Sequence, residues 1–412
     1  MKFVLLGVFF FLVSLYLSAQ DSISHASQLE GRILRLEEAA GKVAALKMSG
    51  YMQVQGIYES VDDATYRLGI RRGRIKLDYR ESLYRGLVQL DITEKGVGVK
   101  DIFFQVSAPF LNTLSFKAGI FDRPFGYEIS YSSSRRESPE RSVVFATLFP
   151  EERDMGASLS LQAPASHPLH LLQLDAGFFA GNGINLDTDN KKDFIAHLRS
   201  SKALSSGLHM GVGASVYHGG VYNAREKAYL MQGDRFVEQS VAVGSFSKRS
   251  YWGLDAQLSM ATSIGRSQLR AEYLRGSQPG TRMSSCSPNY ASLDAWGTEV
   301  DKGGGEGIFI RPFAGYYIYF IQSLGASPLN LVLKYDVYDP NTSVDAMLIE
   351  ASTESAAGLL GAADLAVSTL GVGGVWKFSN ILSLMCYYEY RSNEQKAQAQ
   401  GNKFTLRMQC SF

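Results

Sequence analysis

The end of the chain, Lys403 to Phe412, alternates strictly between apolar and polar side chains. The apolar set is Phe404, Leu406, Met408, Cys410 and Phe412, and the residues between them are polar. Because a strand points successive side chains to opposite faces, this segment predicts a ribbon with one apolar and one polar face. About ten residues is also the length of a tilted strand that crosses a bilayer. One such strand would equally suit a soluble sandwich, so the fold class depends on recurrence.

The same period-two pattern recurs from Ser49 onward, in about sixteen segments, an even number as closed bacterial barrels have. Tight turns alternate with long loops, which are expected at about 122–153, 181–191, 219–248, 276–312 and 340–365. Short turns on one rim and long loops on the other are typical of outer-membrane barrels. The sequence therefore predicts an all-β protein, a transmembrane antiparallel β-barrel over residues 49–412, in the outer membrane of a Gram-negative bacterium.

The N-terminus predicts export. Residues 1–19 combine one Lys, an apolar run from Phe3 to Leu17 and a small residue at Ala19, as a secretory signal peptide does. Residues 20–48 form the one helical pattern, with an apolar seam of Leu29, Ile33, Leu36, Ala40 and Val43. Two interpretations of this segment stay open: a solvated amphipathic spacer, or a short coiled coil that joins protomers.

The overall charge is balanced. The chain has 41 Lys and Arg against 40 Asp and Glu, and removal of the signal peptide with Lys2 leaves the two equal. A neutral chain has no global field that would attract nucleic acid, so any electrostatic selectivity must be local. An exported chain with 3 cysteines is not a disulfide scaffold.

A basic stripe is expected along one strand. Side chains two residues apart share a face, and here they are Arg72, Arg74, Lys76 and Arg80, with Arg85 on the next strand. A barrel of this width leaves a water-filled lumen, so the stripe would line it. The alternative is a set of solvated charges balanced by nearby acids, which are Asp78, Asp91, Glu94 and Asp101.

The third long loop, residues 122–153, is the candidate constriction. Its basic residues are Arg123, Arg135, Arg136, Arg141 and Arg153. Its aromatic residues, with the neighbouring Phe121, would let it fold inward; they are Phe125, Tyr127, Phe145 and Phe149. Rings of Arg and Lys select anions, and the planar guanidinium fork matches phosphate.

Several short motifs resemble those of the phosphate-selective porins O and P. They occupy residues 69–77 (GIRRGRIKL), 99–104 (VKDIFF), 118–125 (AGIFDRPF), 139–142 (PERS) and 152–156 (ERDMG), followed by the final strand. The resemblance implies a homotrimeric porin in outer-membrane lipid, constricted by its third loop and carrying small anions such as phosphate or polyphosphate. Arg135 and Arg136 sit where that family has basic residues in the loop, and Arg141 belongs to the matched motif.

Two features depart from that family. Gln53 and Gln55, rather than Arg, occupy the polar face of the first strand, and the mature chain is neutral. Both departures weaken the expectation of phosphate specificity more than the expectation of a porin.

Two other functions would make different demands on the sequence. An enzyme would need clustered catalytic groups, but the 6 histidines are scattered, and His197 is expected to be a solvated lumen residue. The segment 187–193 resembles a calcium loop, but Lys192 stands where glycine is needed. We therefore predict no catalytic residue, metal site or cofactor. A structural or adhesive barrel, whose long loops bind a partner, remains the alternative to a porin.

Overall fold

The computed structural model describes residues 44–60, 65–108, 113–289, 306–354, 358–395 and 401–412, with single residues 32, 35 and 41. The predicted signal peptide, 1–19, and most of the predicted helical segment, 20–48, lie outside the described residues. The segment does not remain helical to Met48, because strand β1 (Leu46–Ser60) begins earlier than expected. Pairing with β2 decides this boundary, since Leu46 lies opposite Tyr79 and Met48 opposite Leu77.

The described part of the chain consists mostly of strands. After β1 they are β2 (Thr65–Glu81), β3 (Tyr84–Thr93), β4 (Gly96–Ser107), β5 (Leu114–Asp122), β6 (Arg153–Gln162), β7 (Leu172–Phe179), β8 (Asp193–Ser205) and β9 (Leu208–Tyr222). They continue with β10 (Lys227–Gln232), β11 (Arg235–Ser240), β12 (Phe246–Thr262), β13 (Gly265–Gly280), β14 (Ile308–Leu324), β15 (Leu329–Asp339), β16 (Val367–Lys377), β17 (Leu382–Asn393) and β18 (Asn402–Ser411). The helices are α2 (Val143–Leu148), α3 (Ala346–Glu354) and the 3-10 turn η1 (Ala362–Asp364).

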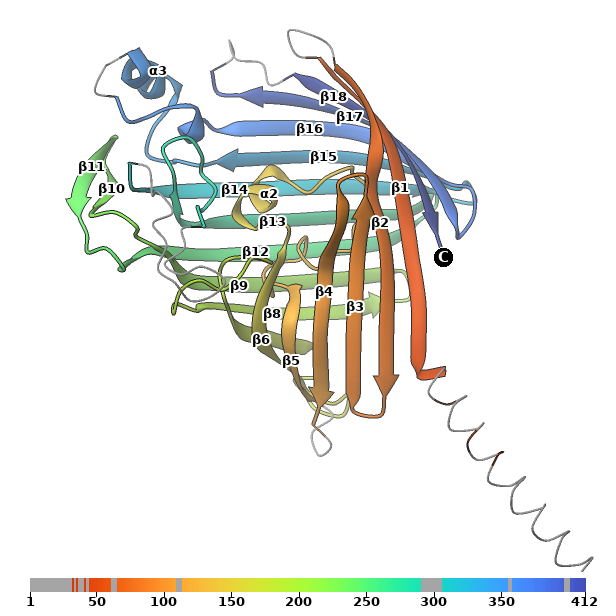
Figure 1. Cartoon of the computed structure of the whole chain (residues 1–412). Coiled ribbons are helices and arrows are strands. Elements are labelled where there is room, and N and C mark those ends of the chain that lie inside the picture. The colour runs from red at the N-terminus through yellow and green to blue at the C-terminus, as the bar shows by residue number, and fades with distance from the viewer. Residues whose placement is uncertain are drawn as a thin grey trace, which may run out of the picture.

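Sixteen of these strands close into an antiparallel barrel, which confirms the predicted fold class (Figure 1). The two ends of the barrel wall meet where β1 pairs with β18, for example Gln53 with Gln409. Gly50 and Phe412 also exchange two backbone hydrogen bonds of 2.9 Å. The remaining strands, β10 and β11, form a hairpin outside the wall, because β9 pairs directly with β12.

The two faces of the wall are inverted relative to a soluble protein. On β18, Leu406 is 44% exposed and faces outward, whereas Thr405 is 0% and Arg407 is 3% exposed, on the inner side. Other strands repeat this arrangement, with large apolar side chains outside and polar side chains inside. An apolar outer surface on a closed barrel faces hydrocarbon, so the barrel resides in a bacterial outer membrane. None of the helices in the described ranges has the length and apolarity that a membrane-crossing helix needs.

The long loops of one rim form a folded cap (Figure 1). Hairpin β10–β11 pairs in parallel with the start of β14, Ala228 opposite Ile308. Beneath it lies an apolar cluster of Tyr229, Phe236, Phe309, Ile349, Leu360 and Leu365. Arg311 of β14 is fully buried and donates to Asp364 at 2.8 Å and to the carbonyl of Thr281 at 2.9 Å, so the loops after β9, β13 and β15 meet at the start of β14.

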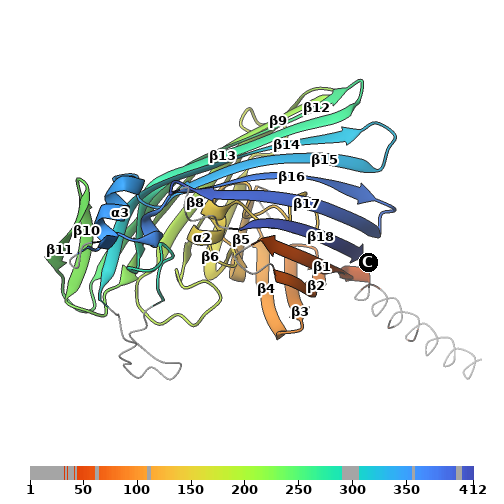
Figure 2. The same cartoon turned by 90° about the horizontal axis from the view of Figure 1, so that it is seen from above.

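Two helices lie in loops where the sequence predicts none. The helix α2 has 6 residues and α3 has 9, too few turns for a periodic pattern to be recognised. Helix α2 belongs to the loop between β5 and β6, residues 123–152, which we term the inner loop. Figures 1 and 2 both show α2 between the opposite walls of the barrel, inside the lumen.

Replacing the outward-facing Leu406 with Arg should destabilise the barrel, because the guanidinium would enter hydrocarbon. The expected loss is about 2–4 kcal/mol in the free energy of unfolding, measured by guanidinium titration in lipid vesicles. Ser115→Arg is the matched control, because Ser115 faces a polar cavity in the lumen and its replacement should cost far less. Equal losses for the two variants would contradict the assignment of the faces.

Candidate functional site: the inner loop

The first turn of the inner loop is bound to the wall by a carboxylate. Glu272 of β13 accepts hydrogen bonds from the backbone N–H groups of Tyr127 (2.8 Å) and Glu128 (2.6 Å). Gly126 donates to the Ser215 hydroxyl at 2.8 Å. Gly126 has a φ of +63°, and a Cβ there would collide with the carboxylate of Glu272. A glycine therefore allows the loop to approach this wall.

Aromatic side chains attach the loop to the same side of the lumen. Phe125, Phe145 and Phe149 are buried. Phe149 packs against Tyr217 and Tyr251, with ring centroids 5.9 and 6.0 Å apart. Burial of such rings contributes roughly 1.5–3 kcal/mol for each side chain. Half of the inner loop is thus fixed by apolar packing against buried apolar residues of the barrel wall.

The other half of the loop reaches the wall formed by β1, β2 and β18. Ser133 is contacted there by the hydroxyl of Tyr51 (2.6 Å) and by Arg74 (3.0 Å). Gln409 donates to the carbonyl of Ser134 at 3.0 Å, and Arg407 to that of Pro139 at 2.8 Å. The inner loop therefore spans the lumen from one wall to the other.

Three arginines converge on Glu140 of the inner loop. Arg71 donates two hydrogen bonds, of 2.6 and 2.7 Å, to its two oxygens. Arg407 lies at 3.2 Å and Arg72 at 3.5 Å from the same carboxylate. Burial alone would raise the pKa of Glu140, but hydrogen bonding and charge from Arg71 and Arg72 hold this pKa well below its usual value.

A second cluster surrounds Glu152, near the end of the inner loop. Lys100 lies at 3.1 Å and Arg153 at 2.9 Å, and Arg141 is also paired with this carboxylate. Burial would raise the pKa of Glu152, but these three cations hold it well below its usual value. Burial lowers the pKa of Arg141 to about 10. Arg141 also donates to the carbonyls of Glu128 (3.0 Å) and Ile129 (3.1 Å), so it fixes the loop's shape.

Two β-bulges bring additional cations into the lumen. The register between β1 and β2 shifts at Gln53, which leaves Arg71 as an extra residue beside Arg72. The register between β3 and β4 shifts at Gln89, which does the same for Lys100 beside Asp101. A bulge re-aims a side chain that strict alternation would place on the opposite face. Arg71 and Lys100 were therefore missed by the sequence analysis.

Arg136 is a buried cation without a hydrogen-bond acceptor. It is 5% exposed, and none of its three guanidinium nitrogens has an acceptor among the described residues. The positive charges of Arg72, Arg141 and Arg407 lie close enough to repel it, and the carboxylates of Glu140 and Glu152 lie close enough to attract it. A buried guanidinium without acceptors is costly, so this position is suited to an anion from solution.

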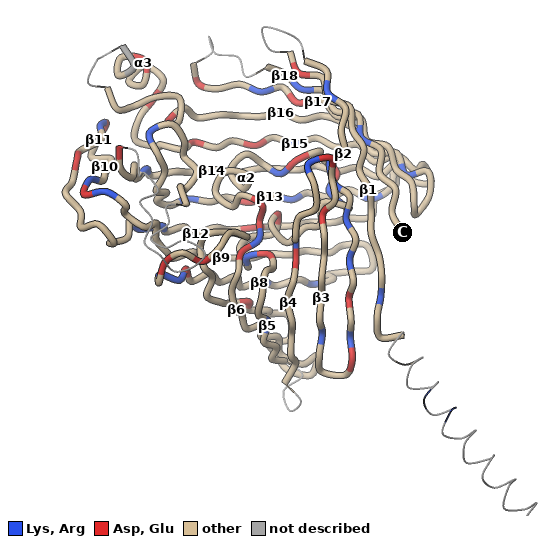
Figure 3. The backbone as a smooth tube through the Cα atoms, in the orientation of Figure 1, with Lys and Arg blue, Asp and Glu red and all other residues tan. Residues whose placement is uncertain are grey.

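These cations form what we term the basic belt, which lies on the inner loop and on strands β2, β4, β6 and β18: Arg71, Arg72, Arg74, Lys100, Arg136, Arg141, Arg153 and Arg407. Ion pairs join seven of the eight to four carboxylates, namely Asp91, Asp101, Glu140 and Glu152. Figure 3 shows blue and red residues gathered where β2 and the inner loop meet. The belt has a clear surplus of positive charge.

The predicted stripe divides into two groups. Arg72 and Arg74 belong to the basic belt. Lys76, Arg80 and Arg85 surround Asp78 instead, at 3.8, 3.0 and 2.9 Å, which again places three cations around one carboxylate.

The remaining predicted loop arginines differ in role. Arg123 donates to the carbonyl of Pro150 at 3.1 Å and lies over the ring of Phe149, so it supports the loop end. Arg135 is exposed, lies 5.6 Å from the ring centre of Tyr131, and has no ion pair among the described residues. The structure does not bring Arg123 or Arg135 into the belt.

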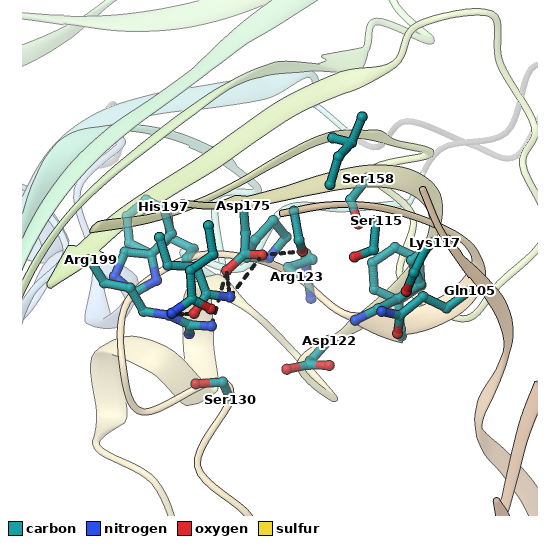
Figure 4. A pocket seen from close by; sticks show the side chains of 18 of the residues that line it. Gln105, Ser115, Lys117, Asp122, Arg123, Ser130, Ser158, Asp175, His197 and Arg199 are labelled. Carbon is teal, nitrogen blue, oxygen red and sulfur yellow. Dashed lines mark hydrogen bonds and ion pairs between the residues drawn. The ribbon is translucent and has the colours of Figure 1, made fainter. Parts of the chain in front are cut away.

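Two cavities flank the inner loop. The basic chamber, of about 620 Å³, has one carboxylate, Glu137, among its lining residues, against five cations: Arg135, Arg136, Arg270, Lys377 and Arg407. The polar chamber, of about 370 Å³, has several Ser and Gln side chains in its lining (Figure 4). Its charged residues are more nearly balanced, with three cations (Lys117, Arg123 and Arg199) and two carboxylates (Asp122 and Asp175), and Arg199 pairs with Asp175 at 3.1 Å. The basic chamber is therefore the one suited to anions.

His197 lines the polar chamber but is not solvated as predicted. It is 3% exposed, and its Nε2 lies 2.9 Å from the carboxylate of Asp255. The prediction is wrong because Asp255 of β12 approaches it across β9, a contact that sequence spacing does not reveal. In the described ranges no group of three or more His, Cys, Asp or Glu side chains could hold a metal ion.

Comparison with known proteins supports the fold. No protein-family description matches this chain, and no curated protein matches its sequence. The structure of Pseudomonas putida OprB at high pH has a TM-score of 0.59 at 10% identity, over 91% of this chain and 96% of that one. An anion-selective porin from Comamonas acidovorans has a TM-score of 0.53 at 12% identity, over 89% and 99%. The trimer form of in-vitro folded OmpT, an outer membrane protein of Vibrio cholerae, has a TM-score of 0.52 at 12% identity, over 89% and 99%.

At these identities the likeness concerns the fold alone: the chain folds as outer-membrane porins do. The narrower resemblance to the phosphate-selective porins stays a prediction, as do the roles of the individual arginines.

Replacing Glu272 with Ala should loosen the start of the inner loop. The change leaves two buried N–H groups without an acceptor, which costs about 1–3 kcal/mol for each group. We expect faster proteolysis within the loop and noisier currents in planar bilayers. Gln268→Ala, four residues away on the same strand, is the control and should leave both unchanged. An unaltered loop in the Glu272 variant would show that the remaining attachments of the loop hold it without this carboxylate.

Acidification should release the loop only at low pH. A carboxylate with a depressed pKa stabilises the folded state above its unfolded pKa, and this stabilisation is lost as the pH falls through the folded pKa. The stabilisation that Glu140 and Glu152 give to the loop should thus be fully present from about pH 7 down to about pH 4.3, the ordinary pKa of Glu. It should be lost progressively as the pH falls further. Current noise as a function of pH measures this. A transition at about pH 6 would contradict the assignment, because an unshifted Glu titrates near 4.3.

Proposed function

We propose that this protein is a porin through which small anions diffuse passively, past an arginine-rich constriction formed by the inner loop. One observation carries the proposal: Arg136 is buried in the lumen with no acceptor for any of its guanidinium nitrogens among the described residues. An anion that passes would supply these acceptors, and a phosphate oxygen pair fits the planar fork. Phosphate or polyphosphate is accordingly the preferred solute.

The surrounding charge supports anions over cations. A potassium ion would meet the surplus positive charge of the basic belt, whereas chloride or phosphate would be stabilised there. The basic chamber continues this environment beside the loop, with Arg135 exposed in it. Clusters of one sign in a low-dielectric channel raise the local concentration of the opposite ion.

The assembly is proposed to be a homotrimer in outer-membrane lipid. The neighbouring structure of OmpT is described as a trimer form, and the Comamonas neighbour as anion-selective. Both properties belong to those proteins and enter here as support for the proposal. We propose no catalytic activity, cofactor or metal for this chain.

Arg136→Ala is the direct test. Removal of a positive charge that lies about 4 Å from a permeating anion changes the energy of that anion by about 1 kcal/mol in water. The change is larger in a confined lumen. We expect phosphate to block the chloride current about fivefold less tightly, with a reversal potential in a salt gradient shifted toward cations. Arg136→Lys should restore most of the selectivity but less of the phosphate block.

The neighbouring Arg135→Ala is the matched control. It removes the same charge from an exposed position, where water and salt screen it, so its effect should be smaller. Cation selectivity of the unaltered protein would overturn the anion proposal while leaving the barrel intact. A folded barrel that passes no current would favour the structural or adhesive alternative.

A further inference from the structure

We infer that Glu140 occupies an anion-binding site of its own channel. Its carboxylate lies between Arg71, Arg72 and Arg407, three arginines that we term the cradle. If Glu140 were absent, a carboxylate or phosphate from solution would bind to these arginines. The inference rests on the proposed function, because it takes the lumen to be a route for anions. It adds a second site beside Arg136 and a residue that sets the affinity of the channel.

The geometry of the contact is that of a bound oxyanion. Arg71 donates hydrogen bonds to both oxygens of Glu140, at 2.6 and 2.7 Å. Guanidinium groups bind free carboxylates and phosphates in the same bidentate arrangement. Arg407 approaches one oxygen at 3.2 Å and Arg72 the other at 3.5 Å. One guanidinium group would neutralise the single negative charge of Glu140, so three of them leave a surplus of positive charge.

Two of the three arginines are held by contacts that do not involve Glu140. Gln55 accepts a hydrogen bond from Nε of Arg407 at 2.9 Å, and the carbonyl of Pro139 accepts another at 2.8 Å. Gln53 accepts from Arg72 at 3.4 Å. Arg72 and Arg407 would therefore keep their positions if the carboxylate left.

Glu140 and Arg71 are the accessible members of this contact. Their side chains are 31% and 37% exposed, whereas those of Arg72 and Arg407 are 5% and 3% exposed. A dissolved anion can therefore reach the carboxylate and Arg71 from the lumen, while Arg72 and Arg407 remain buried. Arg136, with its unsatisfied donors, lies close enough to interact electrostatically with Glu140. An anion at Arg136 would then compete with Glu140 for Arg72 and Arg407.

Glu140 therefore competes with dissolved anions for the three arginines, and it does so as a permanent part of the channel. With the carboxylate in place, an arriving anion meets arginines that are already partly neutralised, so it binds weakly and leaves quickly. Fast exit is what a channel requires, since tight binding would stop the flow.

The experiment compares Glu140→Ala and Glu140→Gln with the unaltered channel in planar bilayers. Block of the chloride current by inorganic phosphate should become at least about fivefold tighter in both variants. Acetate should produce a saturable block in Glu140→Ala, whereas the neutral acetamide should not. Glu151→Ala is the matched control, because Glu151 is an exposed carboxylate of the same loop that lies outside the ion pairs of the basic belt and outside the lining of the basic chamber. It should not tighten the block.

The outcomes separate this inference from the proposed function. If phosphate block is unchanged or weaker in both Glu140 variants, while Arg136→Ala still lowers anion selectivity, Glu140 is only a structural anchor and the inference is wrong. If the unaltered channel is not anion-selective, the proposed function fails first. Noisier currents without tighter block would likewise indicate an anchor. Glu140→Gln retains the size of the side chain, so it gives an answer even if Glu140→Ala does not fold.

Discussion

Hydrogen bonding of the backbone in hydrocarbon is the constraint on which this structure depends. No water reaches the middle of a bilayer, so every strand must find a neighbour on both edges and the sheet must close. Pairing of β1 with β18, ending in the two bonds between Gly50 and Phe412, completes that closure. Once one face of each strand is committed to lipid, polar residues have only the lumen left. The lumen therefore holds charges that must be matched by each other, by water or by a solute.

The inner loop meets this charged interior in two different ways. On the side of β12 and β13 it is held by stacked aromatic rings and by Glu272, which gives a rigid attachment. On the side of β1, β2 and β18 it is held by ion pairs in which cations outnumber carboxylates. Rigid packing thus positions the loop, while the ionic side leaves positive charge available. The apolar attachment therefore supports the loop, whereas the ionic attachment provides the positive charge that is proposed to act on anions.

Much of this architecture follows from alternation in the sequence. The alternation of apolar and polar residues predicts the barrel and the orientation of Arg72, Arg74 and Lys76 toward the lumen. It does so because successive side chains of every strand point outward and inward in turn. The rule fails at Arg71 and Lys100, where bulges insert one residue and turn its side chain inward.

Residue type alone also cannot separate the loop arginines. Arg123 and Arg141 are bonded to loop carbonyls, whereas Arg136 is not, and only the path of the loop determines which is which. The role of Glu272 depends on a contact with Tyr127, far away in sequence, that no local pattern encodes.

The folded cap has a consequence for recognition at the cell surface. Three loops meet there at the start of β14, through the stacking of Tyr229 on Phe309 and the contacts of Arg311 with Asp364 and with the carbonyl of Thr281. An antibody or phage that approaches from outside meets one composite shape rather than three independent peptides. Its epitope would be conformational, and a change in any one loop would alter the surface that the other two present.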